Sequence, residues 1–279
     1  STSSKPIGTN FQGSIKDDFF TSTSKDETFN GGLGVDTVTY SDKLGNYIVK
    51  NRGSHMEVQN KLGADGTDYL LNIESIKFSD FTLNLGIQSK AAGSKPSEIA
   101  SLVELYVSFF NRIPEADGLS YWIGEMQAGK KVSQIAESFF EAGTNFPELT
   151  GYSKSMSDVD FINTVYRNTL GRSGGADQDG LKYWSAELAS GHATRGSLVS
   201  TILNSAHSFK GDAQWGFVAD LLDNKMAVGM KLAVDWGIGY SSNADAISVG
   251  MAIAALITPQ STTQALSVIG VNPDNLQLY

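Results

Sequence analysis

The chain contains no cysteine and only three histidines in 279 residues. Without cysteine there are no disulfide bonds, thiolate nucleophiles or zinc sites with thiolate ligands. His192 and His207 do not form a zinc-protease motif, and His55 lies in a string that resembles an expression-vector remnant. A phosphate-binding glycine loop and a nucleophile elbow are also missing. The sequence therefore predicts a protein that is not an enzyme.

Long apolar runs and an excess of basic charge are absent as well. The densest apolar run, residues 249–257, is much shorter than the roughly 18 residues of a membrane helix, so no membrane span is expected. Residues 1–5 have no leader pattern, which indicates that a signal peptide is absent or already removed. With 30 acidic and 21 basic residues the net charge is -9, which argues against nucleic acid as a partner.

What is present begins with a nine-residue rhythm between residues 13 and 39. The sixth place of each copy is acidic and the eighth is apolar, and the third copy fits the pattern G-G-x-G-x-D-x-U-x throughout. The acidic residues are Asp18, Glu27 and Asp36, and the apolar ones are Phe20, Phe29 and Val38.

Six residues of each copy suit a turn and three suit a short strand, so two copies complete one coil of a parallel β-roll. Asp18 and Asp36 are then one coil apart on the same side. Gly32 and Gly34 permit a turn with positive φ, and the acidic side chains offer hard oxygen ligands. We therefore predict that Asp18, Glu27 and Asp36, with Gly32 and Gly34 in the turn, bind Ca2+.

These copies resemble the RTX, or haemolysin-type calcium-binding, family over about thirty residues. The resemblance implies one or two calcium sites in a protein exported by type I secretion. Lys16 and Lys25 replace the fourth-place glycine, and an ammonium group there can weaken or replace the metal, so a roll without calcium stays open. The alternative is an Asp/Gly-rich loop with a chance rhythm.

Alternating residues predict strands at 37–40, 47–49, 76–78 and 81–85. Residues 63–80 resemble the segment that closes RTX rolls in secreted proteins. Asp65 and Asp68 in this segment are candidates for a second calcium site, although Asp-Gly is also an ordinary turn dipeptide. We assign residues 1–88 to an RTX-like β domain and residues 89–98, rich in small residues, to a linker.

A helical pattern with an internal duplication follows the linker. The string D-G-L-x-Y-W-x-x-E-x-x-x-G occurs at 117–129 and again at 179–191. Upstream, Tyr106 and Arg112 in the first copy match Tyr166 and Arg172 in the second. Each copy predicts a helix that Asp117 or Asp179 caps at its N-terminus, that ends at Gly129 or Gly191, and whose acidic residue pairs with the upstream arginine.

The duplicated region resembles the DUF4214 helical module of extracellular bacterial proteins, over residues 99–212, and residues 213–279 resemble its helical extension. The expected fold class is therefore α+β, with a short parallel β-roll followed by an all-α domain of two repeats. The resemblance supplies no molecular activity.

The repeated acidic and aromatic residues have two interpretations. Aromatic residues at helical spacing usually pack in a core, whereas Trp and Tyr beside carboxylates are also typical of sugar-binding sites. The candidate ligand contacts are Asp117, Tyr121, Trp122, Asp179, Tyr183 and Trp184.

Together these patterns predict a secreted, calcium-binding structural protein of the cell surface, with a role in surface-layer assembly or adhesion. Its expected partners are calcium and either surface polysaccharide or further copies of itself. The alternatives are a glycan-binding module of a secreted protein and a non-catalytic part of a secreted hydrolase.

Overall fold

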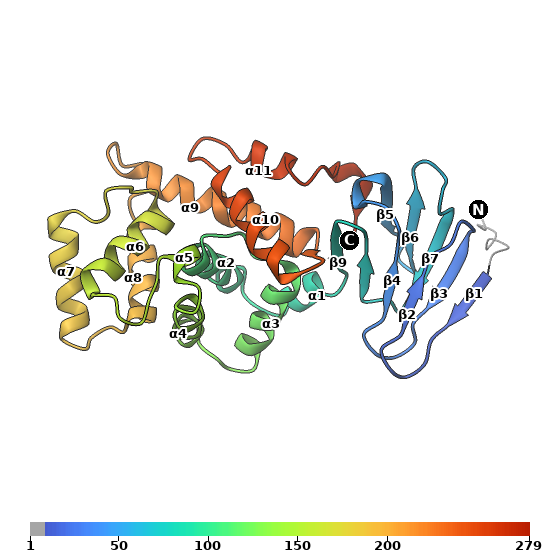
Figure 1. The fold of residues 1–279 in the computed structure, drawn as a ribbon, viewed down its shortest axis with the longest axis horizontal. Helices are drawn as coiled ribbons and strands as arrows, with labels where there is room; N and C mark the ends of the chain where they lie inside the picture. Colours follow the sequence, from blue (N-terminus) through green and yellow to red (C-terminus); the bar gives the residue numbers. More distant parts are fainter. Residues whose placement is uncertain (1–8) are drawn as a thin grey trace.

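A computed structural model describes residues 9–279 and shows an elongated molecule with strands at one end and helices at the other (Figure 1). Residues 1–8, which include residues 1–5 and the start of the predicted β domain, lie outside the described residues. The predicted order of strands followed by helices is confirmed, and the fold is a mixed α/β fold. The chain ends near the junction of the two halves (Figure 1).

The first four strands alternate between two sheets. Phe11 lies opposite Phe29 in one sheet, and Phe20 lies opposite Val38 in the other. Both pairings are parallel, as the nine-residue rhythm predicts, because two copies carry the chain once through both sheets. The strands are β1 (Thr9–Gln12), β2 (Phe19–Thr21), β3 (Glu27–Asn30) and β4 (Thr37–Thr39).

A third passage through both sheets comes later in the chain. β7 (Thr67–Leu71) pairs in parallel with β3, and β8 (Ser75–Lys77) pairs in parallel with β4. Leu70 and Ile76 thereby extend the interior rows that Phe29 and Val38 begin, and all four side chains are buried.

Other strands make both sheets mixed rather than purely parallel. The hairpin of β5 and β6 lies between β4 and β7 in the chain and adds to the first sheet beside β7. β9 and β10 add antiparallel strands to the second sheet. Four of the predicted strands correspond to β4, β5, β8 and β9. The added strands are β5 (Tyr47–Asn51), β6 (Met56–Asn60), β9 (Phe81–Asn84), β10 (Ile238–Tyr240) and β11 (Leu276–Gln277).

The C-terminal extension differs from the all-helical segment that the sequence predicts. β10 pairs with β9, and β11 pairs with β5, so the extension adds one strand to each sheet. Ile238, Leu276 and Leu278 are buried there. This pairing covers sheet edges that would otherwise present unpaired backbone groups.

Helices α2 to α4 form the first repeat and α6 to α8 form the second. Gly129 and Gly191 follow α3 and α7 with φ of +104° and +74°, as expected for the residue after a helix end. The repeat helices are α2 (Pro96–Phe110), α3 (Ala116–Gln127), α4 (Val132–Gly143), α6 (Asp158–Leu170), α7 (Gln178–Ala189) and α8 (Arg195–His207). The others are α1 (Ile87–Ala91), α5 (Pro147–Thr150), α9 (Gly216–Gly229), which continues as a π-helical turn (Met230–Asp235), α10 (Asn243–Ala255) and α11 (Thr263–Ser267).

Buried apolar residues form two cores. The repeats have their own core, which includes Leu102, Leu105 and Phe109 of α2. The interior of the strands forms the second core together with residues of the extension, such as Trp236 and Ile253. The extension therefore holds the strands against the helices.

The apolar run at 249–257 begins inside α10 and is only partly buried, since Gly250, Ile253 and Ala254 are covered whereas Ala252 and Ala255 are exposed. Within residues 9–279, no helix has both the length and the apolar character needed to cross a membrane.

Candidate functional site

Acidic residues of successive coils stack in two columns. In the first column the Asp18 N–H donates to Asp36 Oδ1 at 2.7 Å, and the Asp36 N–H donates to Glu74 Oε2 at 2.8 Å. In the second, the Glu27 N–H donates to Asp68 Oδ1 at 2.9 Å. Each carboxylate thus holds the backbone of the preceding coil, which keeps the columns in register.

Two of the predicted calcium carboxylates are engaged within their own turns. Asp18 Oδ2 accepts hydrogen bonds from the Ser14 N–H and hydroxyl at 2.6 and 3.0 Å. The Glu27 carboxylate accepts from the Thr23 N–H at 2.8 Å and from the Thr23 hydroxyl at 2.6 Å. These bonds give Asp18 and Glu27 a structural role in closing the turns.

Asp36 has a different environment. Its side chain is fully buried, and its Oδ2 has no hydrogen-bond partner in the described part of the chain. A Cβ atom on Gly31 would lie 2.2 Å from this oxygen and 2.2 Å from the carbonyl oxygen of Asn72. The Asp36 carboxylate oxygen and the Asn72 carbonyl oxygen therefore both pack against Gly31, where any side chain would clash. Burying a carboxylate oxygen without a partner is unfavourable, and a cation beside it would offset that cost.

The turn glycines adopt the conformations that the sequence predicts. Gly32 and Gly34 have φ of +93° and +126°, which is a region that side chains disfavour. A Cβ atom on Gly32 would also lie 2.4 Å from the carbonyl oxygen of Ser14 in the neighbouring coil. These glycines allow the coils to stack closely beside Asp36.

Asp65 and Asp68, the candidates for a second calcium site, accept hydrogen bonds from protein donors. Asp68 Oδ2 accepts from the Ser22 hydroxyl at 2.8 Å and the Tyr40 hydroxyl at 2.9 Å, and burial raises the pKa of Asp68 to about 6. The Tyr47 hydroxyl donates to Asp65. These donors engage the oxygens that a calcium ion would need, so the geometry favours Asp36 over this pair.

Side-chain carboxylates alone do not assemble a metal centre here. Among the residues that the structure describes, no three Asp, Glu or His side chains converge as metal ligands would. A calcium ion beside Asp36 would therefore take most of its oxygens from the backbone. Lys16 and Lys25 are exposed, which does not favour either lysine as a substitute for the metal.

The second candidate region is the duplicated motif, where the predicted helix caps are wrong by two residues. Asp177, and not Asp179, is the N-cap of α7, and its Oδ1 accepts from the Gly180 N–H at 2.7 Å. Glu115 precedes α3 in the same way, so Asp117 lies in the first helical turn. The motif acids are therefore not needed as caps, although their negative charge still suits a helix N-terminus.

The predicted ion pairs between the arginines and the motif acids Asp117 and Asp179 are also wrong by two residues, because each arginine pairs with the acidic residue just before the helix. Arg172 lies 3.5 Å from Asp177, and Arg112 lies 3.7 Å from Glu115. In both repeats the arginine thus fixes the residue before the helix and leaves the motif acid to other partners.

Within the motif, the tryptophans pack and the tyrosines face solvent. Trp184 is 7% exposed and donates its indole N–H to the Tyr166 hydroxyl at 3.0 Å. Trp122 is half-buried, whereas Tyr121 and Tyr183 are each 58% exposed. The packing interpretation therefore fits the tryptophans, and the ligand interpretation remains available for the tyrosines.

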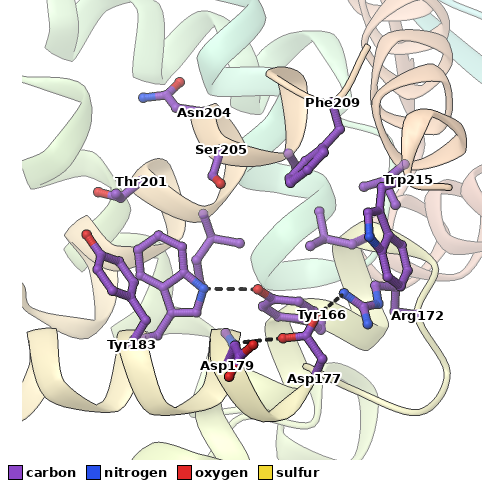
Figure 2. A pocket seen from close by; sticks show the side chains of 16 residues that line it. Tyr166, Arg172, Asp177, Asp179, Tyr183, Thr201, Asn204, Ser205, Phe209 and Trp215 are labelled. Atoms are coloured by element: carbon purple, nitrogen blue, oxygen red, sulfur yellow. Dashed lines mark hydrogen bonds and ion pairs between the residues drawn. The ribbon is translucent and has the colours of Figure 1, made fainter. Parts of the chain in front are cut away.

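A cleft of about 620 Å³ opens between α6, α7, α8 and the start of α9 in the second repeat (Figure 2). Figure 2 shows Tyr183 and Thr201 at one end and Phe209 and Trp215 at the other. Its labelled lining also includes Tyr166, Arg172, Asp177, Asp179, Asn204 and Ser205.

Arg172 is fixed at the Trp215 end of this cleft. Its guanidinium carbon lies 4.1 Å from the centroid of the Trp215 ring and 5.3 Å from that of Tyr166. The nearby Asp177 carboxylate offsets the charge. Stacking and the ion pair hold the arginine as part of the wall.

At the matching place the first repeat has a smaller pocket of about 200 Å³, lined by Phe110, Arg112, Ala142 and Phe146, because Phe139 fills much of the space. Phe139 of α4 and Ile202 of α8 stand equally far from the N-caps of their helices. The Phe139 ring packs edge-on against Tyr106 at 4.9 Å and Trp122 at 5.0 Å. Ile202 lies beside the cleft in the second repeat and is too small to fill it.

The β domain also covers the first repeat. Asn84, at the end of β9, donates its amide N–H to Asp117 Oδ1 at 2.7 Å. The Ile113 N–H donates to the Gly250 carbonyl of α10 at 3.1 Å. The first copy of the motif therefore docks the two halves together, whereas the second copy is open to solvent.

A separate network ties α2, α8 and α9 together. His207 contacts the Glu104 carboxylate, and its Nδ1 lies 3.5 Å from Asp223 Oδ1. Lys210 pairs with the same aspartate at 2.5 Å. The hydrogen bond with Glu104 is the main cause that raises the pKa of His207.

Several site residues escaped the sequence analysis. The sequence did offer a signal for Glu74, because this acidic residue directly precedes β8, the strand that pairs with β4, as Asp18 directly precedes β2. The cleft residues of α8 and the following loop stand outside the repeated string, so nothing local marked them. They are Thr201, Asn204, Ser205, Phe209 and Trp215.

Comparison with known families finds a match over the second repeat. Residues 146–210 match the family described as Domain of unknown function (DUF4214). The match spans α5 to α8 and so includes the open copy of the motif. No curated protein matches the chain.

Proposed function

We propose that the chain belongs to an exported cell-surface protein that calcium stabilises, and that its N-terminal strands form a short β-roll of the RTX type. Support comes from the alternation of β1 to β4 between two sheets and from the third passage by β7 and β8. The stacked acidic columns repeat with the same period, since Asp18 and Asp36 are 18 residues apart.

The observation that carries the proposal is the unpartnered Oδ2 of buried Asp36 beside Gly31. A calcium ion beside Asp36 Oδ2 would be held by this carboxylate together with nearby backbone carbonyls such as that of Asn72. Calcium prefers hard oxygen ligands and tolerates irregular geometry, so carbonyls and one carboxylate suit it. The ion would neutralise the carboxylate and join adjacent turns.

Calcium would then couple folding to export. With little calcium, the stacked carboxylates repel one another and the roll is weak. Where calcium is plentiful, binding to the folded roll stabilises it by mass action. The net charge of -9 strengthens the repulsion that the ion relieves.

The role that we propose for the whole chain is adhesion or assembly at a cell surface. The exposed second repeat stands at the end of the molecule farthest from the strands (Figure 1), where a partner can reach it. Calcium-dependent growth of particles in light scattering would favour assembly, and a protein that stays monomeric would favour adhesion.

The test compares wild-type protein with Asp36→Asn in thermal melts with chelator and with calcium. At calcium concentrations of about 100 times Kd, we expect stabilisation of about 2.7 kcal/mol, or roughly 5–10 °C. Asp36→Asn should abolish this shift while keeping the shape of the side chain. Asp65→Asn is the control, because Asp65 is satisfied by Tyr47 and its loss should leave the calcium shift intact. An equal calcium response in wild type and Asp36→Asn would contradict the proposed site.

A further inference from the structure

We propose that the cleft of the second repeat binds a neutral saccharide, such as a hexose or N-acetylhexosamine unit of a surface glycan. The inference concerns a different part of the chain from the calcium site and does not require calcium.

Its first support is the contrast between the two copies. In the first copy Phe139 packs against Tyr106 and Trp122, and the pocket at the matching place is only about 200 Å³. The second copy keeps the same motif but has Ile202 at the place of Phe139, and a cleft of about 620 Å³ results. That volume lies in the range of roughly 300–1,000 Å³ typical of small-molecule sites.

Aromatic rings that are not buried in the core flank this cleft. Tyr183 is 58% exposed and Phe209 is 39% exposed, although large aromatic side chains usually bury most of their surface. Trp215 is half-buried and presents one face to Arg172. Rings at both ends of the opening suit the apolar faces of a pyranose.

Polar side chains lie between the aromatic rings. Thr201, Asn204 and Ser205 are spaced by three and four residues on α8, so they share one face of that helix. Asp179 faces them from α7 (Figure 2). Hydroxyl, amide and carboxylate groups can each donate to or accept from sugar hydroxyls.

Charge selects a neutral sugar over an acidic one. Arg172 is already offset by Asp177, and Asp179 adds a further negative charge to the lining. A uronic acid or phosphate would meet this carboxylate at short range and would be repelled. A neutral ring meets no such penalty.

The experiment screens the full chain on an array of neutral oligosaccharides, uronic-acid oligosaccharides and peptides, followed by titration of the best binder. We expect neutral oligosaccharides to bind. Tyr183→Ala should weaken binding about tenfold, which corresponds to about 1.4 kcal/mol and lies within the range of one aromatic contact. Tyr121→Ala is the matched control, because this tyrosine is equally exposed in the first repeat but does not line the proposed cleft, so its loss should leave affinity unchanged.

Ile202→Phe provides a second variant, designed to refill the cleft as Phe139 does in the first repeat. It should abolish binding while the far-UV circular dichroism stays that of wild type. Repeating the titration with chelator separates this proposal from the calcium roll, because binding should persist. Binding of only acidic sugars or peptides, no binding at all, or equal losses in Tyr183→Ala and Tyr121→Ala would overturn the proposal.

Discussion

Phe139 of α4 fills much of the space that is a cleft in the second repeat, and its removal should cost much more stability than removal of Ile202 at the matching place in α8. Both side chains are 1% exposed, so simple burial predicts similar costs. The surroundings differ, because Phe139 contacts several rings whereas Ile202 borders a cleft of about 620 Å³.

The magnitudes follow from what each truncation leaves behind. Phe139→Ala opens a closed cavity and removes edge-on contacts with Tyr106 and Trp122, so the loss should be about 3–5 kcal/mol. Ile202→Ala enlarges a space that solvent already enters, so the loss should fall near the lower limit of about 2 kcal/mol. The difference between the two variants should be at least about 1 kcal/mol.

Urea unfolding followed by circular dichroism at the helical band measures both free energies. The slope of the unfolding free energy against urea should stay close to that of wild type in both variants, so that midpoints can be compared. Equal losses, or a greater loss for Ile202→Ala, would refute the view that Phe139 fills much of the first copy of the cleft.

Two further predictions concern the roll and the helix network. Gly31→Ala should weaken the roll by several kcal/mol and abolish the calcium response, because its Cβ would lie 2.2 Å from Asp36 Oδ2. Thermal melts with and without calcium measure this response. A calcium-dependent shift as large as that of wild type would contradict the prediction. The raised pKa of His207, caused first by its hydrogen bond with Glu104, adds stability that is fully present below the ordinary value of 6.5 and is lost as pH rises through the folded-state pKa. His207→Gln should remove that decline from urea midpoints measured across this pH range, and an identical decline in the variant would exclude His207 as its source.

The sequence predicted the parallel pairing of the first four strands well, because the nine-residue period is unbroken there. The acidic and apolar places between residues 13 and 39 led directly to the stacking of Asp18 on Asp36. The third passage followed the same rule, since Asp68 and Leu70 are the sixth and eighth residues counted from Gly63. The β5–β6 hairpin interrupts the period there, which hid the continuation.

Other features depended on contacts that no local pattern encodes. The pairing of β11 with β5 places Leu276 opposite Val49, and nothing in the sequence around either residue indicates that they pair. The helix cap was ambiguous because Asp177 and Asp179 both suit an N-terminus. The cleft depends on the volume of one side chain at Ile202, which reads in the sequence as an ordinary apolar helix position.

Calorimetric titration of calcium into chelator-stripped protein tests the central claim most directly. The proposed roll predicts one saturable calcium site in the wild-type chain and no binding in Asp36→Asn, with Asp65→Asn binding as wild type does. Absence of calcium binding in the wild-type chain, or undiminished binding in Asp36→Asn, would contradict it.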